Sequence, residues 1–159
     1  LMSKKGYSCH VCVLRPKSLG KMTLRSADPE DPPRIDLNFL THADDQKTLV
    51  NGIRLARKIL AAPSFDDYRG AELNPGEEAQ SDEEILARAK EKLGLVYHPV
   101  GTCKMGHDDM AVVDDQLKVH GLENLRVVDA SIMPTLIGGN TNAPTMVIAE
   151  KAADLILGL

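Results

Sequence analysis

The sequence has no long apolar run and no excess of basic residues. None of its apolar stretches approaches the roughly 20 residues that a helix needs to cross a bilayer. The 19 Lys and Arg residues are outnumbered by 23 Asp and Glu residues, which gives a net charge of −4. Such a balance provides no strongly basic surface for nucleic acid. We therefore expect neither a transmembrane segment nor a nucleic-acid partner.

Cysteine is also scarce. An odd number of three cysteines does not support a disulfide framework and is typical of a reducing compartment. We expect a cytoplasmic location, with peripheral attachment to a membrane left open. Cys9 and Cys12 form a C-x-x-C motif, but no second ligand pair stands at the spacing of a zinc site. If residues 7–14 form a strand, the two sulfurs point to opposite faces, which argues against a redox pair.

The chain has no glycine-rich dinucleotide-binding loop, no internal repeat and no low-complexity tract. What it does have is ordinary for a globular protein: 159 residues, of which 43% are hydrophobic and 26% charged. This is the length of about one domain, with enough apolar residues for a core.

The first two thirds of the sequence contain both strand and helix patterns. Residues 7–14 are rich in β-formers and residues 21–25 alternate with a period of two, so we expect a hairpin whose turn lies at residues 16–20. A further short strand is expected over 35–39. Apolar residues at helical spacing predict helices over 42–61 and 82–93. The predicted fold class is therefore α+β, with an antiparallel sheet covered by these helices.

Both helices have capping signals at their N-termini. Thr41 stands three residues before Asp44, and Ser81 stands three residues before Glu84, which is the spacing of a capping box. The last third differs: a buried-strand pattern over 125–129 is followed by a glycine-rich turn and an apolar-faced helix that ends at Gly158. This predicts a C-terminal strand–loop–helix.

His98 is the histidine best suited to chemistry among the five in the chain. Pro99 restricts the backbone that precedes it and so limits how the imidazole can move. An imidazole with an ordinary pKa of about 6.5 is suited to proton abstraction near neutral pH. The alternative from local sequence alone is a buried, hydrogen-bonded histidine with a structural role.

Asn140 and Asn142 follow two glycines and precede the last helix. Turn and N-cap chemistry explains them without any function, for Asn142 next to Pro144 in particular. A functional reading is also available, because the N–H groups at a helix N-terminus stabilise negative charge. A cofactor ring that becomes anionic on reduction would be stabilised there, and Gly138 and Gly139 would permit its close approach.

Four motifs in this order resemble the C-terminal region of the glucose–methanol–choline (GMC) oxidoreductases. They are HPVGTCKMG from His98, AVVD from Ala111, GLENLRVVDASIMP from Gly121 and GNTNAPT from Gly139. The N-terminal LRPKS and LRSADP segments resemble strands of that family's substrate domain. The resemblance covers essentially the whole chain.

The resemblance implies an FAD-dependent enzyme that oxidises a small alcohol to a carbonyl compound. His98 matches the histidine that removes the hydroxyl proton, while flavin N5 accepts the hydride. Asn140 stands where members have a His or Asn that hydrogen-bonds the same oxygen. The resemblance also implies cofactor-binding roles: Asp129 and Ala130 contact the ribityl–pyrophosphate part of FAD, and Asn142, Pro144 and Thr145 form the turn facing the flavin pyrimidine edge.

The resemblance further implies that the chain is the C-terminal part of a longer enzyme. Residues 1–110 would end the substrate-binding domain, with the catalytic histidine near their end, and residues 111–159 would complete the FAD-binding domain. The N-terminal Rossmann part, which carries the family's G-x-G-x-x-G, is absent from these residues. We expect the isolated piece neither to hold FAD tightly nor to turn over.

Three alternatives remain open. Residues 101–106 and 138–144 look more like those of broad alcohol dehydrogenases than of choline dehydrogenases, but choline is a candidate substrate. A flavin-bearing hydroxynitrile lyase would use the same base without redox chemistry, and Asn140 counts against it because such lyases resemble a two-histidine pattern. The last alternative is a non-catalytic module.

Overall fold

A computed structural model describes residues 6–159, and this part of the chain divides into two compact units. The first unit comprises residues 6–13 and 39–94, and the second comprises residues 14–38 and 95–159. These units are defined by contacts within this chain and do not correspond to the two domains expected from the sequence. The division at residue 110 into substrate-domain and FAD-domain parts therefore stays a prediction.

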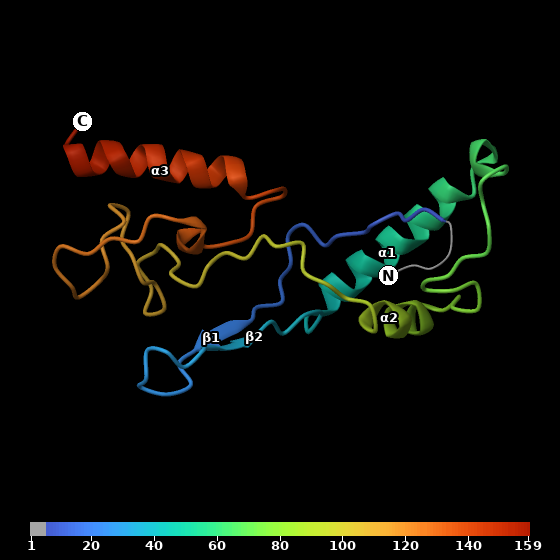
Figure 1. Cartoon of the computed structure of the whole chain (residues 1–159), viewed down its shortest axis with the longest axis horizontal. Helices are drawn as coiled ribbons and strands as arrows, with labels where there is room; N and C mark the ends of the chain where they lie inside the picture. The colour runs from blue at the N-terminus through green and yellow to red at the C-terminus, as the bar shows by residue number, and fades with distance from the viewer. Residues whose placement is uncertain (1–5) are drawn as a thin grey trace. The chain divides into compact units, whose positions relative to one another are not determined.

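The first unit is built on two packed helices, α1 (Ala43–Leu60) and α2 (Asp82–Lys90), with a short 3-10 helix η1 (Pro63–Phe65) after α1 (Figure 1). Its core consists of Val50, Ala79 and Ile85, against which Ile53 and Leu86 pack. Both helices expected from the apolar spacing are present. The second ends at Lys90, three residues earlier than predicted.

The caps of these helices agree only in part with the sequence signals. At α2, the Ser81 hydroxyl accepts the N–H of Glu84 at 3.2 Å, and the Glu84 carboxylate accepts the N–H of Ser81 at 2.9 Å. This is the predicted capping box. At α1 the expected role of Thr41 was wrong: the N-cap is His42, whose Nδ1 accepts the N–H of Asp44 at 3.1 Å. The imidazole takes the place of a hydroxyl one residue further along.

Arg57 of α1 organises the long connection to α2. Its Nε and Nη2 donate to the carboxylate of Glu72, Nη1 donates to the carbonyl of Ala79 at 2.8 Å, and Nη2 also donates to the carbonyl of Gly76 at 2.9 Å. One planar guanidinium thus donates hydrogen bonds to one carboxylate and two backbone carbonyls of the connection.

The second unit contains a two-stranded antiparallel sheet, β1 (Lys21–Thr23) and β2 (Arg34–Asp36), in which Met22 lies opposite Ile35. The predicted hairpin between residues 7–14 and 21–25 was wrong, since residues 7–14 form no strand and β1 pairs with β2 instead. Every residue of both strands is exposed. The two helices expected to cover the sheet belong to the first unit, so this cover stays a prediction.

The core of the second unit lies under its last helix, α3 (Asn142–Leu157), which packs against the 3-10 helix η2 (Ala130–Ile132), as Figure 1 shows at the red end of the chain. Four buried residues form this core: Val113, Leu117, Ile132 and Ala152. As predicted, α3 ends at Gly158, whose φ of +71° places it in the left-handed region that favours glycine.

The strand expected over 125–129 was wrong. Among residues 6–159 its only pairing is an isolated bridge between Arg126 and Lys118, and Asp129 already forms the N-cap of η2. The chain turns into η2 before a ladder can extend. No helix among residues 6–159 combines the length and apolarity required to cross a bilayer.

Candidate active site

Constrained backbone on both sides holds His98. Tyr97 has a φ of +58°, a left-handed conformation that is uncommon for a residue other than glycine, and its side chain is 84% exposed. Pro99 follows directly and restricts His98 to extended conformations. The imidazole itself is half-buried. These features limit the directions in which the ring can point.

The imidazole of His98 reaches the N-terminus of α3. Its Nδ1 lies 2.9 Å from the hydroxyl oxygen of Thr141, the N-cap residue of that helix. The backbone nitrogen of Thr141 lies 3.5 Å from the same ring nitrogen, at the limit of a hydrogen bond. Thr141 is 8% exposed, so this contact is largely shielded from water.

Asn140 immediately precedes Thr141, so it is one residue away in the chain from the hydroxyl that His98 contacts. Consecutive Cα atoms are about 3.8 Å apart. The Asn140 side chain is exposed, and within residues 6–159 no hydrogen bond joins it to His98. Its role toward a substrate stays a prediction.

Asn142 is the first residue of α3 and not its N-cap, so the expectation of N-cap chemistry at this position was wrong. The N-cap is Thr141, yet its hydroxyl makes no capping bond because it contacts His98 instead. The backbone carbonyl of Thr141 accepts the N–H of Thr145 at 3.0 Å and its hydroxyl at 2.7 Å. Asn142 is exposed and Pro144 is half-buried. The first N–H groups of α3 thus have no side-chain cap.

Asp129 and Ala130 lie at the start of η2. The Oδ1 atom of Asp129 accepts the N–H of Ser131 at 2.7 Å, and Ala130 is the first residue of the 3-10 turn. The carboxylate is exposed, while Ala130 is half-buried. Because η2 packs against α3, both parts of the predicted cofactor-binding set lie in the same unit.

Backbone hydrogen bonds connect the segment after His98 to η2. The N–H of Cys103 donates to Ser131 at 3.0 Å, and that of Met105 donates to Ile132 at 2.8 Å. Gly101, with a φ of +88°, allows the chain to turn between His98 and this contact. The first, third and fourth motifs of the sequence thus form one continuous piece of structure.

The second motif is held in the same way. Gly106 donates to the carbonyl of Val113 at 3.0 Å, and the carboxylate of Asp114 accepts the N–H groups of Lys118 and Gln116 at 2.8 and 2.9 Å. The bond from the Lys118 N–H is the main reason why the pKa of Asp114 lies below its ordinary value.

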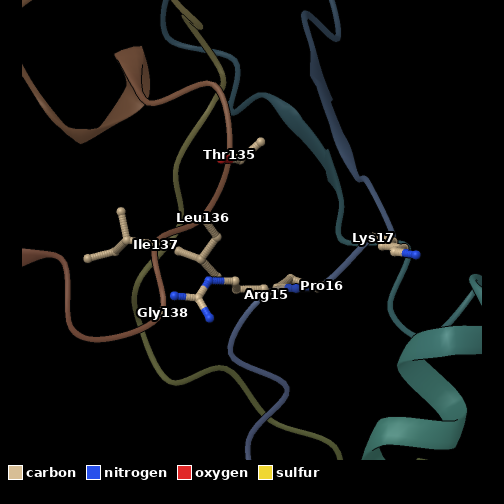
Figure 2. Close-up of a pocket in the computed structure, with 7 residues that line it drawn as sticks. All are labelled: Arg15, Pro16, Lys17, Thr135, Leu136, Ile137 and Gly138. Carbon is tan, nitrogen blue, oxygen red and sulfur yellow. The ribbon is translucent and has the colours of Figure 1, made fainter.

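A hollow of about 520 Å³ lies beside the start of the glycine-rich turn, which Gly138 lines. Arg15, Pro16 and Lys17 line it from one segment and residues 135–138 from the other (Figure 2). Nη2 of Arg15 lies 2.5 Å from the point where a Gly138 β-carbon would stand. None of the predicted site residues lines this hollow, which ends two residues before Asn140.

The C-x-x-C pair is not part of this site. Cys9 and Cys12 are exposed and free, and because their segment is not a strand, the argument from opposite strand faces does not apply. Among residues 6–159 no group of three or more His, Cys, Asp or Glu side chains is placed to hold a metal ion.

Comparison with known proteins shows the family of this chain. A profile of the GMC oxidoreductases matches residues 16–149, most of the chain. This chain belongs to the GMC oxidoreductase family. It is 51% identical over 152 residues to an alcohol dehydrogenase [acceptor] of Pseudomonas putida and covers 28% of that protein. It is 50% identical over 153 residues to an oxygen-dependent choline dehydrogenase of Burkholderia lata and covers 27% of it. In each case 96% of this chain is matched.

Solved structures show the same likeness. A pyridoxine 4-oxidase from Mesorbium loti superimposes with a TM-score of 0.85 and 33% identity over 92% of this chain and 28% of that one. A fungal aryl-alcohol oxidase gives a TM-score of 0.77 and 33% identity over 91% of this chain and 24% of that one. The chain thus spans about a quarter of the length of these GMC relatives.

Thr141 is the residue at this site that the sequence did not point to. A threonine at a helix N-cap is ordinarily interpreted as a cap. Its contact with His98 joins residues 43 positions apart, and no local pattern predicts such a contact. The available signal was its position between the two asparagines of the GMC turn.

Proposed function

We propose that this chain is the C-terminal part of an FAD-dependent alcohol dehydrogenase, which oxidises a CH–OH group to a carbonyl. The observation that carries this proposal is the position of His98, which is bonded to the first turn of α3 directly beside Asn140. In this proposal His98 is the proton acceptor, and Asn140, the residue before Thr141, supplies an amide to the same hydroxyl oxygen.

The residues present fit FAD on two observations. The N-terminus of α3 has no side-chain cap, so its N–H groups are left to stabilise negative charge on a bound group. At η2, Asp129 uses Oδ1 for its own turn, which leaves its other carboxylate oxygen to accept a hydroxyl group. On this basis Asp129 and Ala130 hold the ribityl–pyrophosphate portion, and Asn142, Pro144 and Thr145 hold the edge of the flavin ring.

His98 supplies the acid–base chemistry in this proposal. Its Nδ1 is engaged by Thr141, so Nε2 is the ring nitrogen that takes the hydroxyl proton of the alcohol. FAD, when bound, would supply the acceptor for the hydride of the carbinol carbon, so that the alcohol would leave as a carbonyl compound. Base catalysis of this kind contributes about 10²–10⁴-fold to the rate.

Asn140 orients the alcohol in this scheme. Its amide N–H donates to the hydroxyl oxygen and shares the negative charge that develops there as the proton leaves. The side chain is exposed and makes no bond to His98, so it is available to a substrate. Preorganised donors of this type are worth about 10²–10³-fold.

The proposal also assigns the parts of the chain. Residues 1–110 end the substrate-binding domain and residues 111–159, with η2 and α3, complete the FAD-binding domain. The Rossmann portion that binds the FAD pyrophosphate comes from residues outside these 159. The isolated chain is therefore inactive and holds FAD weakly.

The test uses the full-length protein that carries this chain, purified with its flavin and kept without oxygen. Addition of a primary alcohol is expected to bleach the flavin absorbance, with one equivalent of aldehyde formed per flavin. Cleavage of a cyanohydrin with no bleaching by any alcohol would contradict the proposal and favour a lyase. No change with alcohols or cyanohydrins would favour a non-catalytic module.

Choline is the second candidate substrate, because relatives at 46–50% identity are choline dehydrogenases. Parallel bleaching experiments with choline and with uncharged primary alcohols of similar size separate the two. A preference for the uncharged alcohols is expected from the likeness of residues 101–106 and 138–144 to broad alcohol dehydrogenases.

A further inference from the structure

We propose that Thr141 is a positioning residue, which holds Nδ1 of His98 through its hydroxyl and leaves Nε2 free to take the substrate proton. This inference rests on the proposed role of His98 as the base. It adds a residue to the site and a reason why the imidazole is in the correct protonation state.

The first argument is what the Thr141 hydroxyl does not do. As the N-cap of α3 it would ordinarily accept an N–H of the first helical turn, yet it makes no such bond. With Thr141 only 8% exposed, its hydroxyl needs a partner within the protein. The partner is Nδ1 of His98, at 2.9 Å. The Thr141 hydroxyl therefore bonds to the imidazole and does not cap the helix.

The second argument is the protonation state that this bond permits. A neutral imidazole has one N–H donor and one acceptor nitrogen. When Nδ1–H donates to the Thr141 oxygen, the lone pair stands on Nε2, where a base needs it. After Nε2 has taken a proton, Nδ1–H still donates to the same oxygen. One hydrogen bond therefore serves the imidazole before and after proton transfer.

The backbone N–H of Thr141 favours the opposite tautomer, because it would donate to an unprotonated Nδ1. Its separation of 3.5 Å is at the limit of a hydrogen bond, whereas the hydroxyl contact of 2.9 Å is short. The hydroxyl rotates and can accept as well as donate. We therefore assign the protonation state to the hydroxyl contact.

The variants that test this are Thr141→Val and Thr141→Ser in the full-length flavoprotein. Valine keeps the shape of the side chain and removes the hydroxyl, while serine keeps the hydroxyl. Thr141→Val is expected to lower kcat about 10- to 100-fold with KM changed less than about twofold. Thr141→Ser is expected to restore most of the rate. Thr48→Val, the same change at an exposed position of α1, serves as the control.

A spectroscopic readout separates positioning from a merely structural role. In protein labelled with ¹⁵N-histidine, the ring nitrogen shifts of His98, assigned by comparison with His98→Gln, report which nitrogen carries the proton. With the imidazole neutral, the wild-type protein is expected to show the Nδ1–H tautomer, and Thr141→Val the Nε2–H tautomer or a mixture.

An Nε2–H tautomer in the wild-type protein, or an unchanged tautomer and kcat in Thr141→Val, would overturn the inference. If Thr141→Val yields no folded protein, the wild-type tautomer alone decides. The proposed function fails separately: full activity in His98→Ala would remove the base, whereas an inactive His98→Ala with an unaffected Thr141→Val would remove only the positioning role.

Discussion

The imidazole of His98 and the hydroxyl of Thr141 are 43 residues apart in the sequence and 2.9 Å apart in the structure. The segment that follows His98 is fastened to η2 by backbone bonds from Cys103 and Met105, and η2 packs on the helix that Thr141 begins. The position of the imidazole therefore depends on the core under α3 as well as on its own neighbours.

Loss of the Asn140 amide should affect catalysis and not stability. The side chain is exposed and bonds to no described residue, so Asn140→Ala should change the free energy of unfolding by less than about 0.5 kcal/mol. In the full-length enzyme, kcat/KM for an alcohol should fall about 10²–10³-fold. Thermal melts and steady-state kinetics measure the two effects. Asn51→Ala, at an exposed position of α1, is the matched control, and equal activity in both variants would argue against the role of Asn140.

The core under α3 should be sensitive to the size of Ile132, which is 3% exposed. Ile132→Ala should cost about 2–5 kcal/mol and Ile132→Val about 0.5–1.5 kcal/mol, because the larger truncation leaves a larger cavity. Urea unfolding provides the measurement. Ile156→Ala, a residue 58% exposed on α3, should cost much less. Similar losses at both isoleucines would show that the core is not where the structure has it.

Arg57 should matter more to the first unit than an ordinary surface arginine. Its side chain is 21% exposed and that of its partner Glu72 is 27% exposed, and lysine cannot reproduce the several bonds of the guanidinium. Arg57→Lys should lower the free energy of unfolding by about 1.5–3 kcal/mol. The control is Arg54→Lys, whose partner Asp82 is 67% exposed and whose effect should be below about 1 kcal/mol. Chemical denaturation of both variants compares them, and a larger effect at Arg54 would contradict the account.

The capping box of α2 should make the stability of the protein depend on pH, because protonation of Glu84 in acid weakens it. The N–H groups of Ser81 and Gln80 donate to the Glu84 carboxylate and hold its pKa below the ordinary value. Because the folded-state pKa is the lower one, this contribution is present above the unfolded-state value of about 4.3 and is lost as pH falls through the folded-state value.

Glu84→Gln removes that titration. The variant should be less stable than the wild-type protein at pH 7, and the difference should shrink as pH falls below about 4. Unfolding free energies measured across this range test it. A difference that stays constant, or grows, toward acid would refute the assigned role of Glu84.

Local signals predicted more of this fold than of its site. The helices, the Ser81 and Glu84 cap and the Gly158 stop depend on neighbouring residues, so the sequence alone was sufficient for them. The strands expected over 7–14 and 125–129 were wrong because β-propensity marks residues that suit a strand without naming a pairing partner.

The order of the motifs was sufficient to predict the candidate site residues. Their contacts in space could not be predicted from local sequence patterns. Resemblance to the GMC oxidoreductases pointed to His98 and Asn140, and in the structure His98 contacts Thr141, the residue after Asn140. The contact that places the imidazole is made by Thr141, whose local signal is that of a helix cap. The catalytic role of Asn140 and the cofactor contacts stay predictions.

The most direct test of the account is the rate at which an alcohol bleaches the flavin of the full-length enzyme in a single turnover without oxygen. His98→Ala should slow this rate about 10²–10⁴-fold, because the variant lacks the imidazole that takes the proton. His107→Ala, an exposed histidine on a loop of the same unit, should leave it unchanged. An unaltered bleaching rate in His98→Ala would contradict the central claim that His98 takes the proton of the alcohol.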